Sequence, residues 1–168
     1  MSNVDNNANL NARSTVNKTL CERKTQPLSF GLTNARSLTD KIEAMADYFP
    51  ELDLVFTIVT ETWFYAGAAY EATVETLRGG HGLEVISKMR KKTGSSNPGG
   101  GVSIVYKKDK IRLKEHKIYR ANYEIVAATG KIPNNSRQFY IIGIYLSPRL
   151  KAKTCHKIWP VCQIRYSK

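Results

Sequence analysis

Leu52-Asp-Leu-Val-Phe-Thr-Ile-Val-Thr-Glu-Thr-Trp63 is a nearly continuous apolar run that ends in a carboxylate between two threonines. A run this short and this rich in Val, Ile, Phe and Thr is typical of a strand that is buried on both faces in the middle of a sheet. A carboxylate at its end needs a cation, a metal or a capping role to offset desolvation, unless it has simply reached solvent. Glu61 is therefore a candidate ligand of a hard metal ion, with a solvated strand end as the alternative.

A strand and a helix are predicted to precede this run. Leu28, Phe30 and Leu32 alternate with small or polar residues, which predicts a strand with these three side chains on its buried face. Ser37-x-x-Asp40 resembles a capping box at the start of a helix that ends at Pro50. The apolar positions at helical spacing are Ile42, Met45, Ala46 and Phe49. Residues 28–63 thus have the dimensions of a strand, helix, strand crossover.

Two polar side chains end the two strands of this unit, Asn34 the first and Glu61 the second. In crossover units the loops beyond the carboxyl ends of the strands gather on one rim of the sheet, so we expect these side chains to be neighbours. The carboxylate would bring charge and the amide an oriented dipole to a hard cation and a phosphate oxygen. Asn is also favoured in turns, so a turn residue is the alternative for Asn34.

The rest of the ordered pattern is dominated by strands. A helical patch over Ala68–Leu77 precedes strands predicted at Leu83–Ile86, Val102–Tyr106, Ile111–Ile118, Tyr123–Thr129 and Gln138–Leu146. The last strand is apolar on both faces, which is typical of a central strand. Tyr145 lies at its exit, where its hydroxyl could reach the rim of Asn34 and Glu61. A core tyrosine hydrogen-bonded to a backbone carbonyl is the alternative.

The net charge of +12 is unevenly distributed along the chain. Residues 29–87 carry 3 basic and 9 acidic side chains, whereas residues 88–168 carry 19 and 3. So basic a half attracts polyanions by counterion release, which favours nucleic acid, and specifically DNA, as the partner. A solvated lysine-rich surface is the alternative. The candidate contacts are Arg36 beside the rim, the glycine-rich stretch with Lys88, Arg90, Lys91 and Lys92, and the basic segment Lys107–Lys117.

Composition divides the chain into three parts: a disordered Asn-rich tail (1–26), one partial domain (27–148) and an irregular basic tail (149–168). No apolar run approaches the roughly 18 residues of a membrane helix, so we expect no membrane partner. The three scattered cysteines fit reduced thiols better than disulfides or a zinc site, which favours an intracellular location, nuclear if DNA is the partner.

Four short motifs follow one another over residues 28–148: Thr33-Asn-Ala-Arg-Ser-Leu38, Val59-Thr-Glu-Thr-Trp63, Pro98-Gly-Gly-Gly-Val-Ser-Ile-Val105 and Ile142-Gly-Ile-Tyr-Leu-Ser-Pro148. In this order they resemble the endonuclease/exonuclease/phosphatase superfamily, and more narrowly the endonuclease domain of non-LTR retrotransposon (reverse transcriptase) polyproteins. The resemblance implies an α/β fold, namely part of a four-layer α/β sandwich related to deoxyribonuclease I. It also implies that Glu61 is the carboxylate ligand of Mg²⁺ or Mn²⁺, that Asn34 is its partner at the metal and phosphate, and that Tyr145 positions the phosphate.

The same family continues with an Asp-x-Asn motif and closes with a Ser-Asp-His motif, and neither follows Pro148 in this chain. In the family these residues activate the attacking water, help to bind the phosphate and assist in-line displacement. The resemblance therefore implies a truncated Mg²⁺-dependent DNA endonuclease that is inactive alone. A non-catalytic nucleic-acid-binding remnant and a phosphatase of the same superfamily are the alternatives. Without its second sheet, such a domain is expected to self-associate through an uncovered sheet face.

Overall fold

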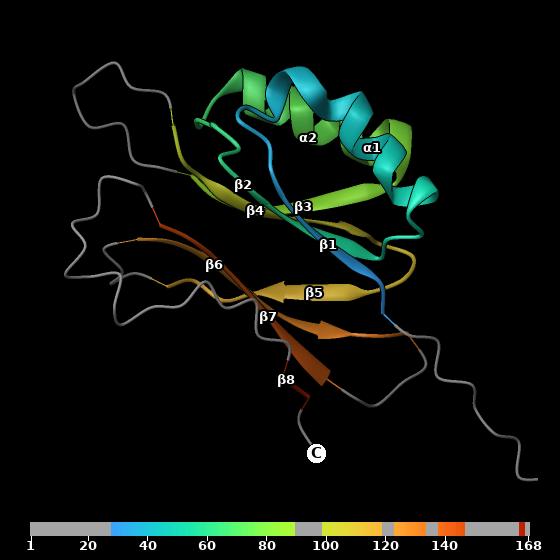
Figure 1. The fold of residues 1–168 in the computed structure, drawn as a ribbon. Coiled ribbons are helices and arrows are strands. Elements are labelled where there is room, and N and C mark those ends of the chain that lie inside the picture. Colours follow the sequence, from blue (N-terminus) through green and yellow to red (C-terminus); the bar gives the residue numbers. More distant parts are fainter. Residues whose placement is uncertain (1–27, 90–98, 119–122, 134–137, 147–164, 167–168) are drawn as a thin grey trace, which may run out of the picture.

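The computed structural model describes residues 28–89, 99–118, 123–133, 138–146 and 165–166 of the 168-residue chain (Figure 1). Two four-stranded sheets pack face to face, and two helices cover the outer face of the first sheet. The described part of the chain is thus an α/β sandwich of three layers: helices, first sheet and second sheet. The predicted fold class is confirmed, and of the four expected layers the described residues form these three.

The first sheet has the strand order β1-β2-β4-β3 and the second has the order β5-β6-β7-β8. The strands of the first sheet are β1 (Phe30–Asn34), β2 (Phe56–Thr60), β3 (Leu83–Lys88) and β4 (Val102–Lys107). The strands of the second sheet are β5 (Arg112–Glu115), β6 (Glu124–Lys131), β7 (Gln138–Tyr145) and β8 (Arg165–Tyr166). The helices are α1 (Ile42–Glu51) and α2 (Ala68–His81), with a 3-10 turn, η1 (Thr39–Lys41), before α1.

The predicted crossover unit is present, because β1 and β2 are parallel neighbours joined by α1. Its helix differs from the prediction at both ends. The Ser37 hydroxyl contacts the Asp40 carboxylate at 3.5 Å, but the 3-10 turn intervenes and α1 begins at Ile42 without a side-chain cap. Pro50 lies inside the last turn instead of ending the helix, which continues to Glu51.

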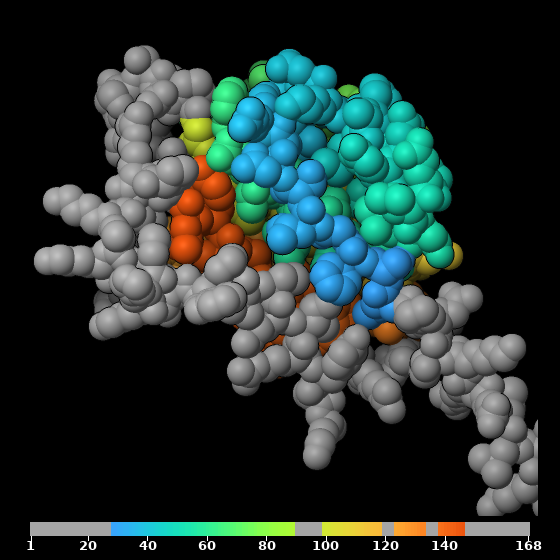
Figure 2. Space-filling view, viewed as in Figure 1, coloured from blue at the N-terminus to red at the C-terminus, as the bar shows by residue number. Residues whose placement is uncertain are grey.

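The predicted buried face of β1 is wrong. Phe30 and Leu32 are 44% and 65% exposed, and Figure 2 shows this edge strand, in blue, at the surface. These side chains pair with Phe56 and Ile58 of β2, and so they share the face that meets the second sheet. That sheet packs against β2, β3 and β4, and β1 lies at its margin. Phe30 gains partial cover by stacking on Phe56, with ring centroids 5.3 Å apart.

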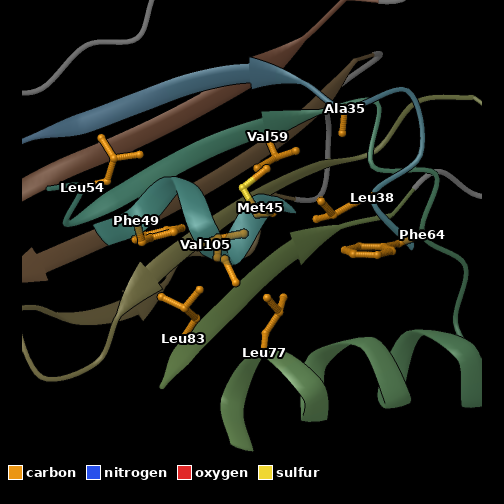
Figure 3. Close-up of a cluster of buried hydrophobic side chains, with 11 residues drawn as sticks. Ala35, Leu38, Met45, Phe49, Leu54, Val59, Phe64, Leu77, Leu83 and Val105 are labelled. Atoms are coloured by element: carbon orange, nitrogen blue, oxygen red, sulfur yellow. The ribbon is translucent and has the colours of Figure 1, made fainter. Parts of the chain in front are cut away.

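Each face of the first sheet has its own apolar core. The core on the helical face joins α1 and α2 to the sheet (Figure 3), and it includes Met45, Phe49, Val59, Leu77, Leu83 and Val105. The core between the sheets includes Phe56, Ile58, Val102, Ile104, Val126, Ala128, Phe139 and Ile141. β2 contributes to both cores, which explains why its sequence is apolar at successive positions.

The predicted uncovered sheet face needs a correction. On the inner face of β7, Phe139 and Ile141 are 1% and 0% exposed, because this face packs against the first sheet. A second sheet is therefore present in the described residues. The outer face of β7 is more open, since Tyr140 is 43% exposed. Self-association stays a prediction, and of the two faces of β7 only the outer one remains available for it.

The two predicted tails have different outcomes. Residues 1–26 lie outside the described residues. Within residues 149–168, predicted to be irregular, Arg165–Tyr166 form β8 and pair with Phe139–Tyr140 of β7. Among the helices that the structure describes, none is both long and apolar enough to cross a membrane.

Candidate functional site

The three predicted site residues come together at one rim of the sandwich. Asn34 ends β1 and pairs with Thr60, the residue before Glu61. Tyr145 ends β7 in the other sheet, and its hydroxyl donates a hydrogen bond of 2.8 Å to Glu61 Oε1. The predicted convergence of these residues is therefore present. The contact between Tyr145 and Glu61 also replaces the alternative in which the phenol donates only to a backbone carbonyl.

Glu61 lies in a strained turn that backbone hydrogen bonds hold in place. Glu61 and Trp63 have φ values of 52° and 55°, in the left-handed region that costs a residue other than glycine about 1–3 kcal/mol. The Glu61 carbonyl accepts the Ser37 N–H at 2.9 Å, and the Trp63 N–H donates to the Gly100 carbonyl at 2.9 Å. These bonds fix the direction in which the Glu61 side chain leaves the backbone.

Asn34 is exposed and has a local role as well as a place on the rim. Its Oδ1 accepts the Arg36 backbone N–H at 3.2 Å, which is the turn interaction typical of asparagine. Asn34 therefore acts as a turn residue, as the alternative interpretation predicted. It does not exclude a ligand role, because an amide oxygen has two lone pairs.

Glu124 is a rim residue that the sequence reasoning missed. It begins β6 as the cross-strand partner of Tyr145, and its Oε2 accepts the Gly101 N–H at 2.5 Å. The Gly101 carbonyl in turn accepts the Thr62 N–H at 3.5 Å, so Glu124 is linked through one glycine to the turn of Glu61. The sequence did contain a signal for it. Glu124 lies two residues before Val126 in an alternating strand, so both side chains face inward.

Gly101 is required where the glycine-rich stretch meets this turn. Its φ is +86°, and a Cβ would lie 2.4 Å from Thr62 Oγ1. Thr62 Oγ1 and Trp63 Nε1 are buried and make no hydrogen bond within the described part of the chain. Such orphaned polar atoms are uncommon in folded proteins and call for a water, an ion or a catalytic role. Both lie within two residues of Glu61.

The donors at the rim fit a hard cation. Asn34 and Glu61 offer only oxygen, and Mg²⁺ requires one or two carboxylates because it keeps several of its waters. Glu61 Oε1 accepts the Tyr145 hydroxyl, whereas Oε2 has no hydrogen bond within the described residues and can face a cation. The described residues hold no cluster of three or more His, Cys, Asp or Glu side chains that could hold a metal ion.

Two of the predicted nucleic-acid contacts flank the rim. Arg36 is exposed two residues beyond Asn34, and Lys88 is exposed at the end of β3. Lys88 is the cross-strand partner of Val102, and Val102 is in turn the partner of Thr60 on β2. The Lys88 Nζ donates a hydrogen bond of 3.5 Å to the Ile118 carbonyl. Arg90, Lys91 and Lys92 lie outside the described residues, and the predicted segment Lys107–Lys117 runs from the end of β4 through β5.

The charge cluster of Glu84 lies away from the rim and has a structural role. The Arg78 guanidinium donates two hydrogen bonds to the Glu84 carboxylate, at 3.1 and 3.2 Å, and Lys108 Nζ lies 3.4 Å from it. The bonds from Arg78 lower the pKa of Glu84. Because the pKa of Glu84 is lower in the folded than in the unfolded chain, this carboxylate contributes stability at pH values above its unfolded pKa. That stability is lost as the pH falls through the folded pKa.

Comparisons with known proteins give structural matches alone. No family model matches the sequence, and no curated protein matches it. The human Nocturnin catalytic domain with bound sulfate matches with a TM-score of 0.50 and 14% identity, covering 67% of this chain and 44% of that chain. D. rerio TDP2 complexed with a single-strand DNA product matches with a TM-score of 0.52 and 13% identity, covering 77% and 50%. The fold is that of the deoxyribonuclease I-like sandwich. This chain spans half or less of the length of these endonuclease/exonuclease/phosphatase-fold structures, and at such identities the likeness concerns the fold alone.

Proposed function

We propose that this chain forms the metal- and phosphate-binding part of a DNA endonuclease domain that depends on Mg²⁺ or Mn²⁺. The observation that carries the proposal is the 2.8 Å hydrogen bond from Tyr145 to Glu61, which joins residues 84 positions apart at the ends of the two sheets. A bond between a phenol and a strained, half-buried carboxylate at the rim of this fold is a feature of a built site.

The residues at the rim would divide the work as follows. Glu61 Oε2 and Asn34 Oδ1 would hold the cation, which when bound polarises a phosphoryl oxygen and neutralises developing charge. Tyr145 orients the Glu61 carboxylate through its hydrogen bond and lies where its phenol could also steer a phosphate oxygen. Glu124 holds the Gly101 backbone against the segment that follows Glu61. The rim therefore supplies binding and orientation.

DNA is the substrate that the charge distribution favours. Residues 88–168 carry 19 basic and 3 acidic side chains, which a small-molecule or lipid phosphatase would not need. The similar fold of D. rerio TDP2 holds a single-strand DNA product, which supports the same class of substrate. The resemblance of the four motifs to retrotransposon endonucleases supports nicking of a target for reverse transcription, and a nuclear location, as the finer role.

A non-catalytic nucleic-acid-binding remnant is the second candidate. The observation that favours it is the distribution of acidic residues, since none follows Glu124 in the sequence. A remnant of this kind would keep the basic half and the fold, and it would bind DNA without cleaving it.

Cation binding tests the proposed site. We expect the wild type to bind Mn²⁺ weakly in a water-proton relaxation titration. Glu61→Gln should bind at least about tenfold more weakly, because loss of even an outer-shell partner typically costs 10- to 100-fold. Glu51→Gln, which changes an exposed carboxylate at the end of α1, should bind like the wild type. Equal Mn²⁺ affinity of Glu61→Gln and the wild type would contradict the assignment of the ligand.

The salt dependence of DNA binding tests the basic stretch. Each phosphate neutralised on a duplex contributes about 0.9 to the slope of log affinity against log salt. Replacing Lys88, Arg90, Lys91 and Lys92 together by serine should therefore flatten that slope. Glu61→Gln, measured without divalent cations, should keep the slope of the wild type. An unchanged slope in the quadruple variant would show that the stretch is a solvated surface.

A further inference from the structure

The outer face of the second sheet carries a basic and aromatic surface that the rim does not use. The inward residues of β6, such as Val126 and Ala128, meet the first sheet, so the alternate residues face outward. At the end of the sheet away from the rim, the outward side chains of β5, β6 and β7 form two adjacent rows, whereas Ala127, farther along the same face, is buried. We call them the outer-face patch: Lys114, Thr129 and Tyr140 in one row, and Arg112, Lys131 and Gln138 in the other.

The charges in this patch are not balanced within the described chain. Arg112 and Lys131 are direct cross-strand partners, and both are exposed. Like charges directly opposite each other destabilise a sheet, so this pair costs stability unless an anion lies between or above them. Lys114 adds a third exposed cation on the same face, and none of the three makes a salt bridge with a described residue. The patch is therefore complementary to a polyanion.

Tyr140 adds an aromatic ring to these cations. It is 43% exposed although it lies inside β7, with β6 on one side and β8 on the other. Its row places Thr129 and then Lys114 beside it. Neighbouring strands are about 4.8 Å apart, so the backbones of Tyr140 and Lys114 are roughly 10 Å apart. A ring and a row of cations at this separation can contact the base and the phosphates of one nucleotide strand.

We propose that the outer-face patch binds single-stranded nucleic acid, with a base stacked on Tyr140 and the phosphates against Arg112, Lys114 and Lys131. Sheet faces that combine aromatic rings with basic side chains bind single strands in this way, because unpaired bases expose their faces and bases in a duplex do not. An anionic membrane or an acidic peptide would use the cations but not the ring. This site goes beyond the proposed function, since it requires neither Glu61 nor a cation.

The test measures binding of a fluorescein-labelled thymidine homopolymer to the 168-residue chain by anisotropy, in EDTA. Tyr140→Leu should weaken binding about 5- to 150-fold, the range of one stacked base, and Tyr140→Phe should retain it. Tyr48→Leu is the matched control, because Tyr48 is 48% exposed on α1, in a different layer. Arg112→Gln combined with Lys131→Gln should lower the salt slope by about 1.4, because each phosphate that a cation neutralises on a single strand contributes about 0.7.

Four results would overturn the proposal. The first is equal affinity of Tyr140→Leu and Tyr48→Leu for the homopolymer. The second is an unchanged salt slope in the double charge variant, which decides the matter if Tyr140→Leu does not fold. The third is a duplex hairpin that binds at least as tightly as the single strand and whose binding is weakened by the same variants. The fourth is binding to anionic vesicles that these variants weaken while binding of the single strand is unchanged. Tyr140→Leu should keep the Mn²⁺ affinity of the wild type, because Tyr140 lies on the outer face and not at the rim, so failure of the cation site and failure of this patch are separate outcomes.

Discussion

Replacing Phe139 by alanine is expected to lower the free energy of unfolding by about 3–5 kcal/mol, the usual cost of a buried Phe→Ala change. Phe139 is 1% exposed between the two sheets, where its ring stacks on Phe56 with centroids 6.5 Å apart. Its ring also covers Gly130, where a Cβ would lie 2.2 Å from it. The loss is a large fraction of the roughly 5–15 kcal/mol that stabilises a typical domain.

Urea unfolding followed by circular dichroism measures this loss, and the adjacent Tyr140→Ala change is its control. Tyr140 is 43% exposed on the other face of β7, so its truncation should cost no more than about 1 kcal/mol. A Phe139→Ala loss as small as that of Tyr140→Ala would mean that the two sheets do not share a core. The difference between the two losses in unfolding free energy therefore tests whether the second sheet packs on the first.

The candidate site could be predicted from local patterns because each of its residues ends a strand. Parallel strands joined by a right-handed crossover place their exits on one rim, so Asn34 and Glu61 had to be neighbours once β1 and β2 were recognised. Tyr145 followed from the same reasoning, since Pro148 limits how far its strand can extend. The contact between Tyr145 and Glu61 shows that strand exits carry usable information about which residues converge.

The features that sequence reasoning missed depend on which strands pair across the fold. Alternation showed that Leu32 and Thr33 face opposite sides of β1, but it did not show that β1 is an edge strand at the margin of the second sheet. β8 has only two residues, which is too short for a period to appear. The bond from Gly101 to Glu124 joins a loop to a strand in the other sheet, and local propensity does not specify such a contact.

The 168-residue chain alone is expected to leave supercoiled plasmid intact in Mg²⁺. A bound cation can polarise a phosphate, but hydrolysis also requires a water that is oriented and deprotonated, and positioned acid-base groups typically contribute about 10²- to 10⁴-fold. Residues 149–168 contain no Asp or Glu, so neither an Asp-x-Asn nor a Ser-Asp-His motif occurs among them. At the rim, Glu61 and Glu124 already accept hydrogen bonds from Tyr145 and Gly101.

A plasmid-nicking assay on purified chain, with Glu61→Ala as the control for contaminating nuclease, decides between binding and turnover. We expect equal, background nicking by the two proteins, because Glu61 is proposed only to hold a cation and no residue of the described rim is assigned as a base for the water. DNA binding measured in parallel should persist in both, since the basic half is unchanged. Mg²⁺-dependent nicking that Glu61→Ala abolishes would refute the prediction. The base would then have to be Glu124 or a residue of the segment 149–168, and Glu124→Gln would distinguish them.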